Sequence, residues 1–227
     1  PELGRDTAHH EALLLEAHFR IEHRGRDLAG HAFNFNGTAG VWRRQAIEDA
    51  GGWSADTLTE DLDLSYRAQL AGWRFVYRDD LEVQSELPES WSAFRAQQSR
   101  WVRGGVQTAR KLLPAILRAQ AWSVPKRVEA LLHLIGNSAY LWLALLGLLL
   151  PAAVVLRHEL GPSVPGGAYT LALFDVASLG AGTLAITVFY GCASWLSARR
   201  LALPTIALAL AVGAGLSIHN GLEALRA

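Results

Sequence analysis

The last hundred residues contain apolar stretches long enough to limit sharply what this chain can fold into. Residues 128–156 are nearly all apolar, and residues 168–195 form a second stretch interrupted by Asp175 and small polar residues. Both exceed the roughly 20 residues that a helix needs to cross a bilayer. A third stretch, residues 201–218, would give a helix of about 27 Å, which is barely sufficient. Because three such stretches lie close together, we predict a transmembrane region over 128–227 rather than buried core helices.

The distribution of basic residues predicts how these spans are oriented. Residues 90–128 contain no acidic side chain but carry eight arginines and lysines. Since basic residues favour the cytoplasmic side, the region before the first span is predicted to be cytoplasmic, in the plasma or inner membrane if the protein is bacterial. The loop 157–167 should then face outward. A third full crossing would leave residues 219–227 outside, whereas a re-entrant segment would keep them inside.

Composition gives no support for a nucleic acid partner and excludes a disulfide-stabilised fold. The formal net charge is zero, so no overall basic field favours a nucleic acid partner. The single cysteine, Cys192, excludes a disulfide framework within the chain.

There is no methionine, and no leader-like pattern follows Pro1. The first strand-like segment also comes without the βαβ units that usually precede it, so we expect this sequence to be a fragment of a longer protein.

The first half has the mixed composition of a globular domain. Helical periodicity and boundary residues predict helices over residues 7–28, 43–50, 59–70 and 91–112. Alternating patterns predict short strands at 32–42, 75–77 and 81–83. Thr59 is expected to be the N-cap of its helix, and Pro114 is expected to end the last one. Arginines and tryptophans alternate in residues 91–127, which is typical of helices at a membrane surface.

Two short motifs carry candidate chemistry. The first is Thr59-Glu60-Asp61, which places Asp61 in the first turn of a helix, where a carboxylate could act as a general base. The alternative is an acid that merely stabilises the helix N-terminus.

The second motif is Gln97-x-x-Arg100-Trp101, which reads Q-x-x-R-W. Its three residues lie at i, i+3 and i+4 and so share one side of a helix. Arginine can bind a diphosphate through its planar guanidinium group, and tryptophan can stack on a sugar ring. The alternative is an ordinary amphipathic helix with a buried tryptophan.

In combination the motifs resemble a known family. Phe35-Asn-Gly-Thr-Ala-Gly-Val-Trp-Arg43, Ala50-Gly-Gly-Trp53, Thr59-Glu-Asp-Leu-Asp-Leu64, Gly72-Trp73, Glu86-Leu-Pro88 and Q-x-x-R-W occur in this order. The set resembles the inverting family-2 glycosyltransferases, and within them the cellulose-synthase-like and mannan-synthase-like membrane members. The resemblance covers about residues 7–127 and extends loosely into the spans.

The resemblance implies a fold and a domain organisation. The fold class would be α/β plus transmembrane α. Residues 1–90 would be the C-terminal part of a GT-A, Rossmann-like domain. Residues 91–127 would be interfacial helices, and residues 128–227 a transmembrane bundle.

The resemblance also implies roles for the motif residues. Asp61 would be the general base. Gly37 and Thr38 would lie beside the acceptor sugar, with Thr59 and Glu60 among the substrate-binding residues. The donor diphosphate would be bound by Gln97 and Arg100, and the acceptor would stack on Trp101.

The family also requires a divalent metal, Mg²⁺ or Mn²⁺, held by an upstream Asp-x-Asp, and an upstream aspartate for the nucleobase. Neither has a counterpart in this sequence. Asp61-Leu-Asp63 has the spacing but belongs to the downstream motif, so we predict no metal site there. The pair His9-His10 followed by Glu11 lacks further ligands at a suitable spacing. We therefore expect this chain to be inactive by itself.

Three functions remain open. The first is a processive hexosyltransferase that extends a β-linked polysaccharide from a nucleotide sugar at the membrane. The second is a glycosyltransferase that adds one or a few sugars to a lipid, and the third is a non-catalytic membrane subunit. Q-x-x-R-W favours the first, because a stacking tryptophan suits a growing chain, and the intact Thr59-Glu60-Asp61 disfavours the third.

Three polar residues in the first two apolar stretches also stand out. Asp175 is a functional candidate, although a contact to Ser178, a tilt toward the interface or a water-lined groove would also explain it. His133 and Asn137 are expected to form interhelical or interfacial hydrogen bonds.

Overall fold

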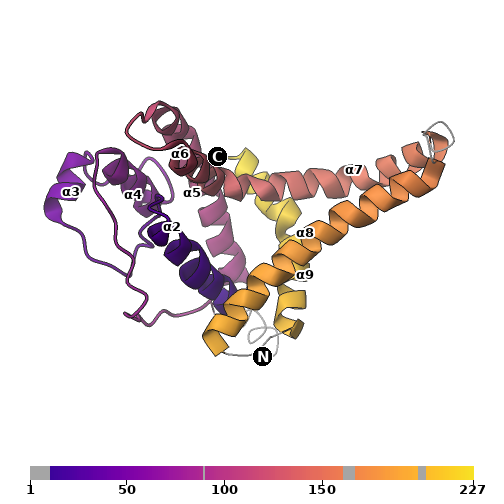
Figure 1. Ribbon diagram of the computed structural model, residues 1–227, viewed down its shortest axis with the longest axis horizontal. Helices are drawn as coiled ribbons and strands as arrows, with labels where there is room; N and C mark the ends of the chain where they lie inside the picture. The colour runs from indigo at the N-terminus through magenta and orange to yellow at the C-terminus, as the bar shows by residue number, and fades with distance from the viewer. Residues whose placement is uncertain (1–10, 89, 161–166, 199–202) are drawn as a thin grey trace.

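The computed structural model describes residues 11–88, 90–160, 167–198 and 203–227. It places a globular half beside a long helical hairpin (Figure 1). The regular elements are η1 (His18–His23), α2 (Arg24–Leu28), α3 (Arg44–Asp49), α4 (Glu60–Leu70), α5 (Trp91–Arg118), α6 (Val124–Ile135), η2 (Gly136–Ser138), α7 (Ala139–Leu160), α8 (Gly167–Ala198) and α9 (Leu203–Leu225). The helix predicted over 7–28 is present from residue 11, where an α-helical stretch continues through the π-helical η1 into α2.

The segments predicted as strands do not form a sheet. Within the described ranges the structure contains no β-strand. Residues 31–36 are extended, but their backbone groups bond to side chains of α4. The amide of Phe33 donates to Gln69 Oε1 (3.3 Å), and the amide of Phe35 donates to Ser65 Oγ (2.8 Å). The α/β, Rossmann-like prediction is therefore not confirmed, and the backbone of Phe33 and Phe35 finds its hydrogen-bond partners on a helix.

The main core lies between α4, α5 and α6. Its members are Ala32, Leu62, Tyr66, Ala109, Leu112, Ile116, Trp122, Ala130 and Leu134. This core explains why the prediction that Pro114 ends the helix is wrong. Proline removes one backbone hydrogen bond, but Leu112 and Ile116 on either side of it are buried in the core. Their packing holds α5 helical through Pro114, which is itself exposed.

The first predicted span is divided in the structure. Residues 124–135 form the amphipathic α6, which buries Ala130 and Leu134 against α4 and α5. A short 3₁₀ turn, η2, then leads into the apolar α7. His133 at the end of α6 forms the expected interhelical bond, with its Nδ1 2.6 Å from Tyr66 Oη on α4. The predicted boundary at 128 thus falls inside α6, whose buried side packs on the globular core.

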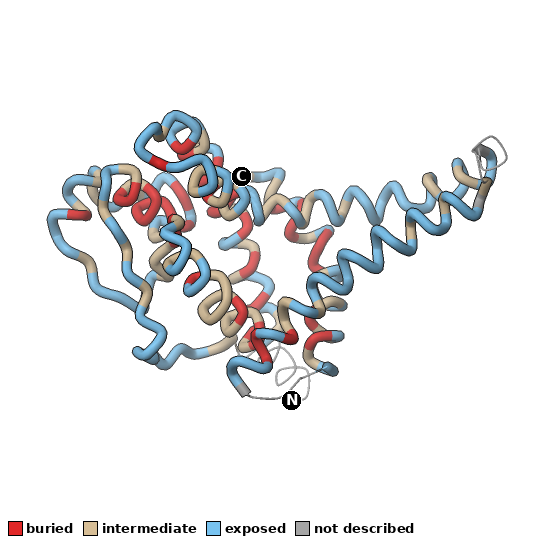
Figure 2. The backbone as a smooth tube through the Cα atoms, viewed as in Figure 1, coloured by how far each residue is buried: buried red, intermediate tan, exposed pale blue. Residues whose placement is uncertain are grey.

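Among the residues that the structure describes, three helical stretches are long and apolar enough to cross a membrane, namely Val124–Glu159, Tyr169–Ser197 and Leu203–Leu225. The hairpin of α7 and α8 extends away from the globular half with apolar side chains exposed along most of its length (Figure 2). Asp175 on α8 forms an ion pair with Arg157 on α7. Pairing of this kind lowers the cost of an acid at membrane depth.

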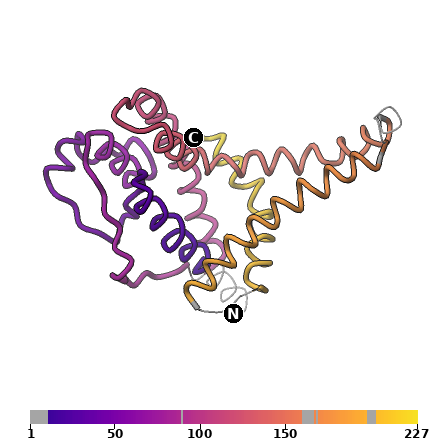
Figure 3. The backbone as a smooth tube through the Cα atoms, in the orientation of Figure 1, coloured from indigo at the N-terminus to yellow at the C-terminus, as the bar shows by residue number. Residues whose placement is uncertain are grey.

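The helix α9 contacts the globular half near both of its ends. Near its start, Ile206 and Ala209 pack with Leu13, Ala17 and Ala193 in a second apolar cluster. Near its end, Glu223 forms an ion pair with Arg103 of α5. Figure 3 shows this path, with α9 running from the end of α8 back to the region where α5, α6 and α7 meet. The helix also continues to Leu225, beyond the predicted end at 218.

Candidate active site

The N-terminus of α4 packs directly on α5. Thr59 is the residue before α4, as predicted, but its hydroxyl does not cap the helix. Thr59 Oγ1 lies 3.1 Å from Thr108 Oγ1 of α5, and both residues are buried. The predicted capping bond is absent because the hydroxyl is used between the two helices.

A glycine on α5 permits this close approach. A Cβ atom on Gly104 would lie 2.6 Å from Thr59 Cγ2 and 2.8 Å from Thr59 N. Gln97, Trp101, Gly104 and Thr108 follow one another at i, i+4, i+7 and i+11, so they share one face of α5. The structure therefore brings the Thr59-Glu60-Asp61 turn onto the face of α5 that carries Gln97 and Trp101.

The carboxylate of Asp61 is partly buried in the first turn of α4. Its Oδ1 accepts a hydrogen bond from the amide of Leu62 (2.8 Å). Burial raises the pKa of Asp61 above its ordinary value, the nearby charge of Glu60 adds to this, and the Leu62 bond opposes it. A carboxylate with a raised pKa has a higher affinity for a proton, which suits a general base.

Gly37 lies beside the second carboxylate oxygen. It adopts a φ of +74°, a conformation that favours glycine. A Cβ atom added there would be 3.4 Å from Asp61 Oδ2. Thr38 follows, exposed, with its amide bonded to the Asn36 carbonyl (2.8 Å). Gly37 and Asp61, which belong to two different sequence motifs, thus lie side by side.

The residues of Q-x-x-R-W differ in how accessible they are. Arg100 and Trp101 are exposed, so both can meet a ligand. Gln97 is half-buried and its side chain bonds to Glu11, a buried acid whose pKa is raised by desolvation. Glu60 is exposed beside Asp61. The roles assigned to these residues and to Asp61 from the resemblance remain predictions.

The residues described here do not fit a divalent metal. Among them no group of three or more His, Cys, Asp or Glu side chains could hold one. Asp63, the second acid of Asp61-Leu-Asp63, is fully buried, and its oxygens face Arg67 (2.7 Å) and Lys111 (3.0 Å). Two cations already neutralise this carboxylate, so it has little to offer a metal ion.

Sequence analysis missed the polar residues on the buried side of α4. Ser65 and Gln69 follow Asp61 at i+4 and i+8, so the three residues form one stripe along the helix. Both are buried and both bond to the extended segment 33–35. The signal that could have revealed them is this spacing of polar residues on a face that also carries core residues.

Comparison with known proteins identifies the class to which this fold and site belong. The family model described as "Glycosyl transferase family group 2" matches residues 7–212. The chain therefore belongs to this family of glycosyltransferases, as the motifs indicated.

Among individual proteins, the chain is similar to plant glucomannan mannosyltransferases. The chain is 43% identical over 121 residues to glucomannan 4-beta-mannosyltransferase 1 of Oryza sativa subsp. japonica, covering 53% of this chain and 23% of the relative. It is 45% identical over 117 residues to glucomannan 4-beta-mannosyltransferase 7 of Arabidopsis thaliana, covering 52% of this chain and 21% of the relative. The chain thus spans less than a quarter of the length of these curated relatives. No solved structure matches it.

Proposed function

We propose that this chain forms the acceptor side of an inverting, processive hexosyltransferase that extends a β-linked polysaccharide at the membrane. The observation that carries the proposal is the position of Asp61. One of its carboxylate oxygens is bonded to the Leu62 amide, and the other faces Gly37 at a turn packed on the Trp101 face of α5. A carboxylate in this position can receive the proton of an acceptor hydroxyl.

The reaction follows from this arrangement. The acceptor hydroxyl loses its proton to Asp61 Oδ2, and its oxygen attacks the anomeric carbon of the donor sugar. The bond between that carbon and the diphosphate breaks as the new bond forms on the opposite side, so the configuration inverts. The departing nucleoside diphosphate gains negative charge, which the guanidinium group of Arg100 would stabilise.

The acceptor would be positioned by stacking. An exposed tryptophan offers a flat apolar surface to the ring of a hexose, and Trp101 lies one helical turn from Gly104, where α4 meets α5. A growing chain that stacks on Trp101 would present its terminal hydroxyl toward Asp61. The names of the relatives favour a nucleotide-linked mannose as the first donor to test.

The remaining partners belong to the same proposal. The residues that bind the nucleobase of the donor and the ligands of a Mg²⁺ or Mn²⁺ ion would lie in parts of the enzyme outside residues 1–227. The globular region 1–90 and the interfacial helices 91–127 would lie on the cytoplasmic side, with the region 128–227 in the bilayer. The exposed apolar hairpin of α7 and α8 supports the location of region 128–227 in the bilayer.

The test uses the full-length enzyme that carries these residues, purified in lipid nanodiscs and supplied with nucleotide-linked mannose or glucose. Chains of ten or more β-linked sugars, absent in Asp61→Asn and retained in the surface control Asp80→Asn, are the expected result. A lipid carrying one or two sugars as the only product would favour the glycolipid transferase. No product with any nucleotide hexose would favour a non-catalytic subunit.

A further inference from the structure

We propose that Ser65 and Gln69 are positioning residues that hold the extended segment Phe33–Asn36 so that Gly37 and Thr38 face Asp61. The inference rests on the proposed function, since it concerns how the acceptor is placed against the base. Neither residue touches the reacting atoms in the proposed reaction. They act by fixing the backbone on which the acceptor-side residues are carried.

Gln69 binds the start of the segment. Its Nε2 donates to the Phe33 carbonyl (2.7 Å) and to the Ser65 carbonyl (2.8 Å), and its Oε1 accepts from the Phe33 amide (3.3 Å). The side-chain amide of Gln69 thus bonds both the N–H and the C=O of Phe33, as a neighbouring β-strand would. Both Phe33 and Gln69 are buried, and buried backbone groups without partners are costly. The two hydrogen bonds between Gln69 and the backbone of Phe33 therefore fix the position of Phe33 against α4.

Ser65 links the segment to the base itself. Its Oγ accepts from the Phe35 amide (2.8 Å) and donates to the carbonyl oxygen of Asp61 (2.6 Å). One oxygen atom is therefore bonded both to the residue that carries the carboxylate and to the segment that leads into Gly37. This oxygen is fully buried with its residue, so water cannot readily replace either bond.

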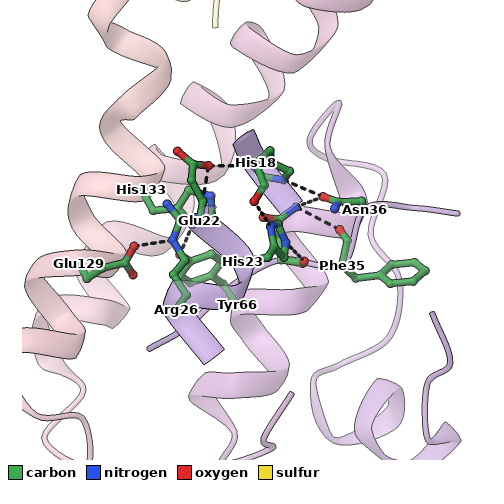
Figure 4. Close-up of polar contacts among 10 residues, drawn as sticks. His18, Glu22, His23, Arg26, Phe35, Asn36, Tyr66, Glu129 and His133 are labelled. Carbon is green, nitrogen blue, oxygen red and sulfur yellow. Dashed lines mark hydrogen bonds and ion pairs between the residues drawn. The ribbon is translucent and has the colours of Figure 1, made fainter. Parts of the chain in front are cut away.

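The opposite side of the segment is bonded to the first helix. His23 Nε2 donates to the Asn34 carbonyl (2.8 Å), and His18 Nε2 lies 3.4 Å from Asn36 Oδ1. Figure 4 shows both histidines approaching the segment from the helix formed by η1 and α2. Asn36 Oδ1 also accepts from Asn34 Nδ2 (2.5 Å). Segment 33–36 is therefore bonded from both sides, and Gly37 begins the turn that follows it.

This arrangement predicts that loss of Ser65 affects transfer to an acceptor more than hydrolysis of the donor. Losing the Ser65 hydroxyl would let Phe35 and Gly37 move away from Asp61, while the carboxylate keeps its bond to Leu62. Transfer to a sugar acceptor needs Gly37 and Thr38 in place. Hydrolysis of the donor by water needs the base but not a placed acceptor. The ratio of transfer to hydrolysis should therefore fall, whereas a general loss of folded enzyme would lower both rates together.

The experiment compares Ser65→Ala with Ser65→Thr, which retains a hydroxyl, and with the exposed control Ser92→Ala. In the full-length enzyme, Ser65→Ala is expected to lower the ratio of transfer to hydrolysis about threefold to tenfold, as loss of one positioning hydrogen bond would, and to raise the acceptor KM. Ser65→Thr should recover part of this loss. Proportional losses of both rates, or no change in the ratio, would overturn the proposal.

Hydrogen–deuterium exchange gives a readout that does not depend on activity. The peptide covering residues 31–36 should exchange faster in Ser65→Ala and in Gln69→Leu, while peptides from α5 keep their wild-type rates. Unchanged exchange in both variants would show that Ser65 and Gln69 do not hold this segment, even if activity fell. If the wild-type enzyme formed no glycosidic product, the proposed function would fail, but the exchange result would still decide whether Ser65 and Gln69 hold the segment.

Discussion

Gly104 of α5 approaches Thr59 so closely that a Cβ atom added to the glycine would lie 2.8 Å from the Thr59 backbone nitrogen. This contact joins the helix that carries Q-x-x-R-W to the turn that carries Asp61. Because the atom in the way belongs to the backbone, it cannot rotate aside as a flexible side chain could.

Gly104→Ala is therefore expected to separate α4 from α5 and to destabilise the protein by about 1–3 kcal/mol. Alanine otherwise favours a helix over glycine by up to about 1 kcal/mol, so the sign of the effect is informative. Gly147→Ala on α7, where no atom lies within 4 Å of the added Cβ, is the matched control. Thermal unfolding in detergent should show a lower midpoint only for Gly104→Ala, and equal midpoints would contradict the tight contact.

Asp61→Asn should lower transfer about 10²–10⁴-fold while nucleotide-sugar binding is largely retained, because only the proton acceptor is lost. Burial raises the pKa of Asp61, and the base must be ionised to act. Activity should therefore fall on acidification at a higher pH than for an exposed aspartate. Rate measurements across pH, with calorimetric binding of the donor, test both points. Near-normal transfer by Asp61→Asn would remove this residue from the mechanism.

Trp101→Ala should reduce chain elongation more than donor hydrolysis, because stacking on the exposed indole positions the acceptor. Product length by gel or mass spectrometry and hydrolysis by nucleotide release are the measurements. Trp142→Ala, which removes an exposed tryptophan of α7 that has no proposed role, is the control. Equal losses of elongation and hydrolysis would argue against an acceptor platform at Trp101.

The ion pair between Arg103 and Glu223 should couple α5 to α9. Glu223 is buried and also bonds Arg226 (2.6 Å). A double-mutant cycle with Arg103→Gln and Glu223→Gln is expected to give an interaction free energy of about 0.5–3 kcal/mol. The exposed pair Arg44 and Glu48 should give only about 0.3–0.5 kcal/mol. A coupling no larger than this control would show that α9 is not held to α5 through the pair.

The contacts of α9 with the globular half near both ends predict the side on which the chain ends. After replacement of Cys192, Ala227→Cys should react with a membrane-impermeant maleimide from the same side as Ser92→Cys. Glu159→Cys, near the end of α7, should react from the opposite side. Labelling of Ala227→Cys together with Glu159→Cys would instead support a third full crossing by α9.

The sequence alone was sufficient where structure follows from neighbouring residues. Helical periodicity and capping residues located α3, α4 and the beginning of α5 to within about two residues. The length of the apolar stretches predicted the α7–α8 hairpin. The order of short motifs was enough to identify the family. The resemblance, and no chemical argument from the residues alone, then led to the hypothesis that Gly37, Thr38 and Asp61 belong to one site.

Only the tertiary structure could decide interactions between residues far apart in the chain. The extended segment 33–36 has the pattern of a strand, yet its partners are Ser65 and Gln69 on a helix. Proline usually ends a helix, but α5 continues past Pro114 because Leu112 and Ile116 are buried in the core. A backbone group bonds to whichever partner the packing brings near, and a local pattern does not contain that information.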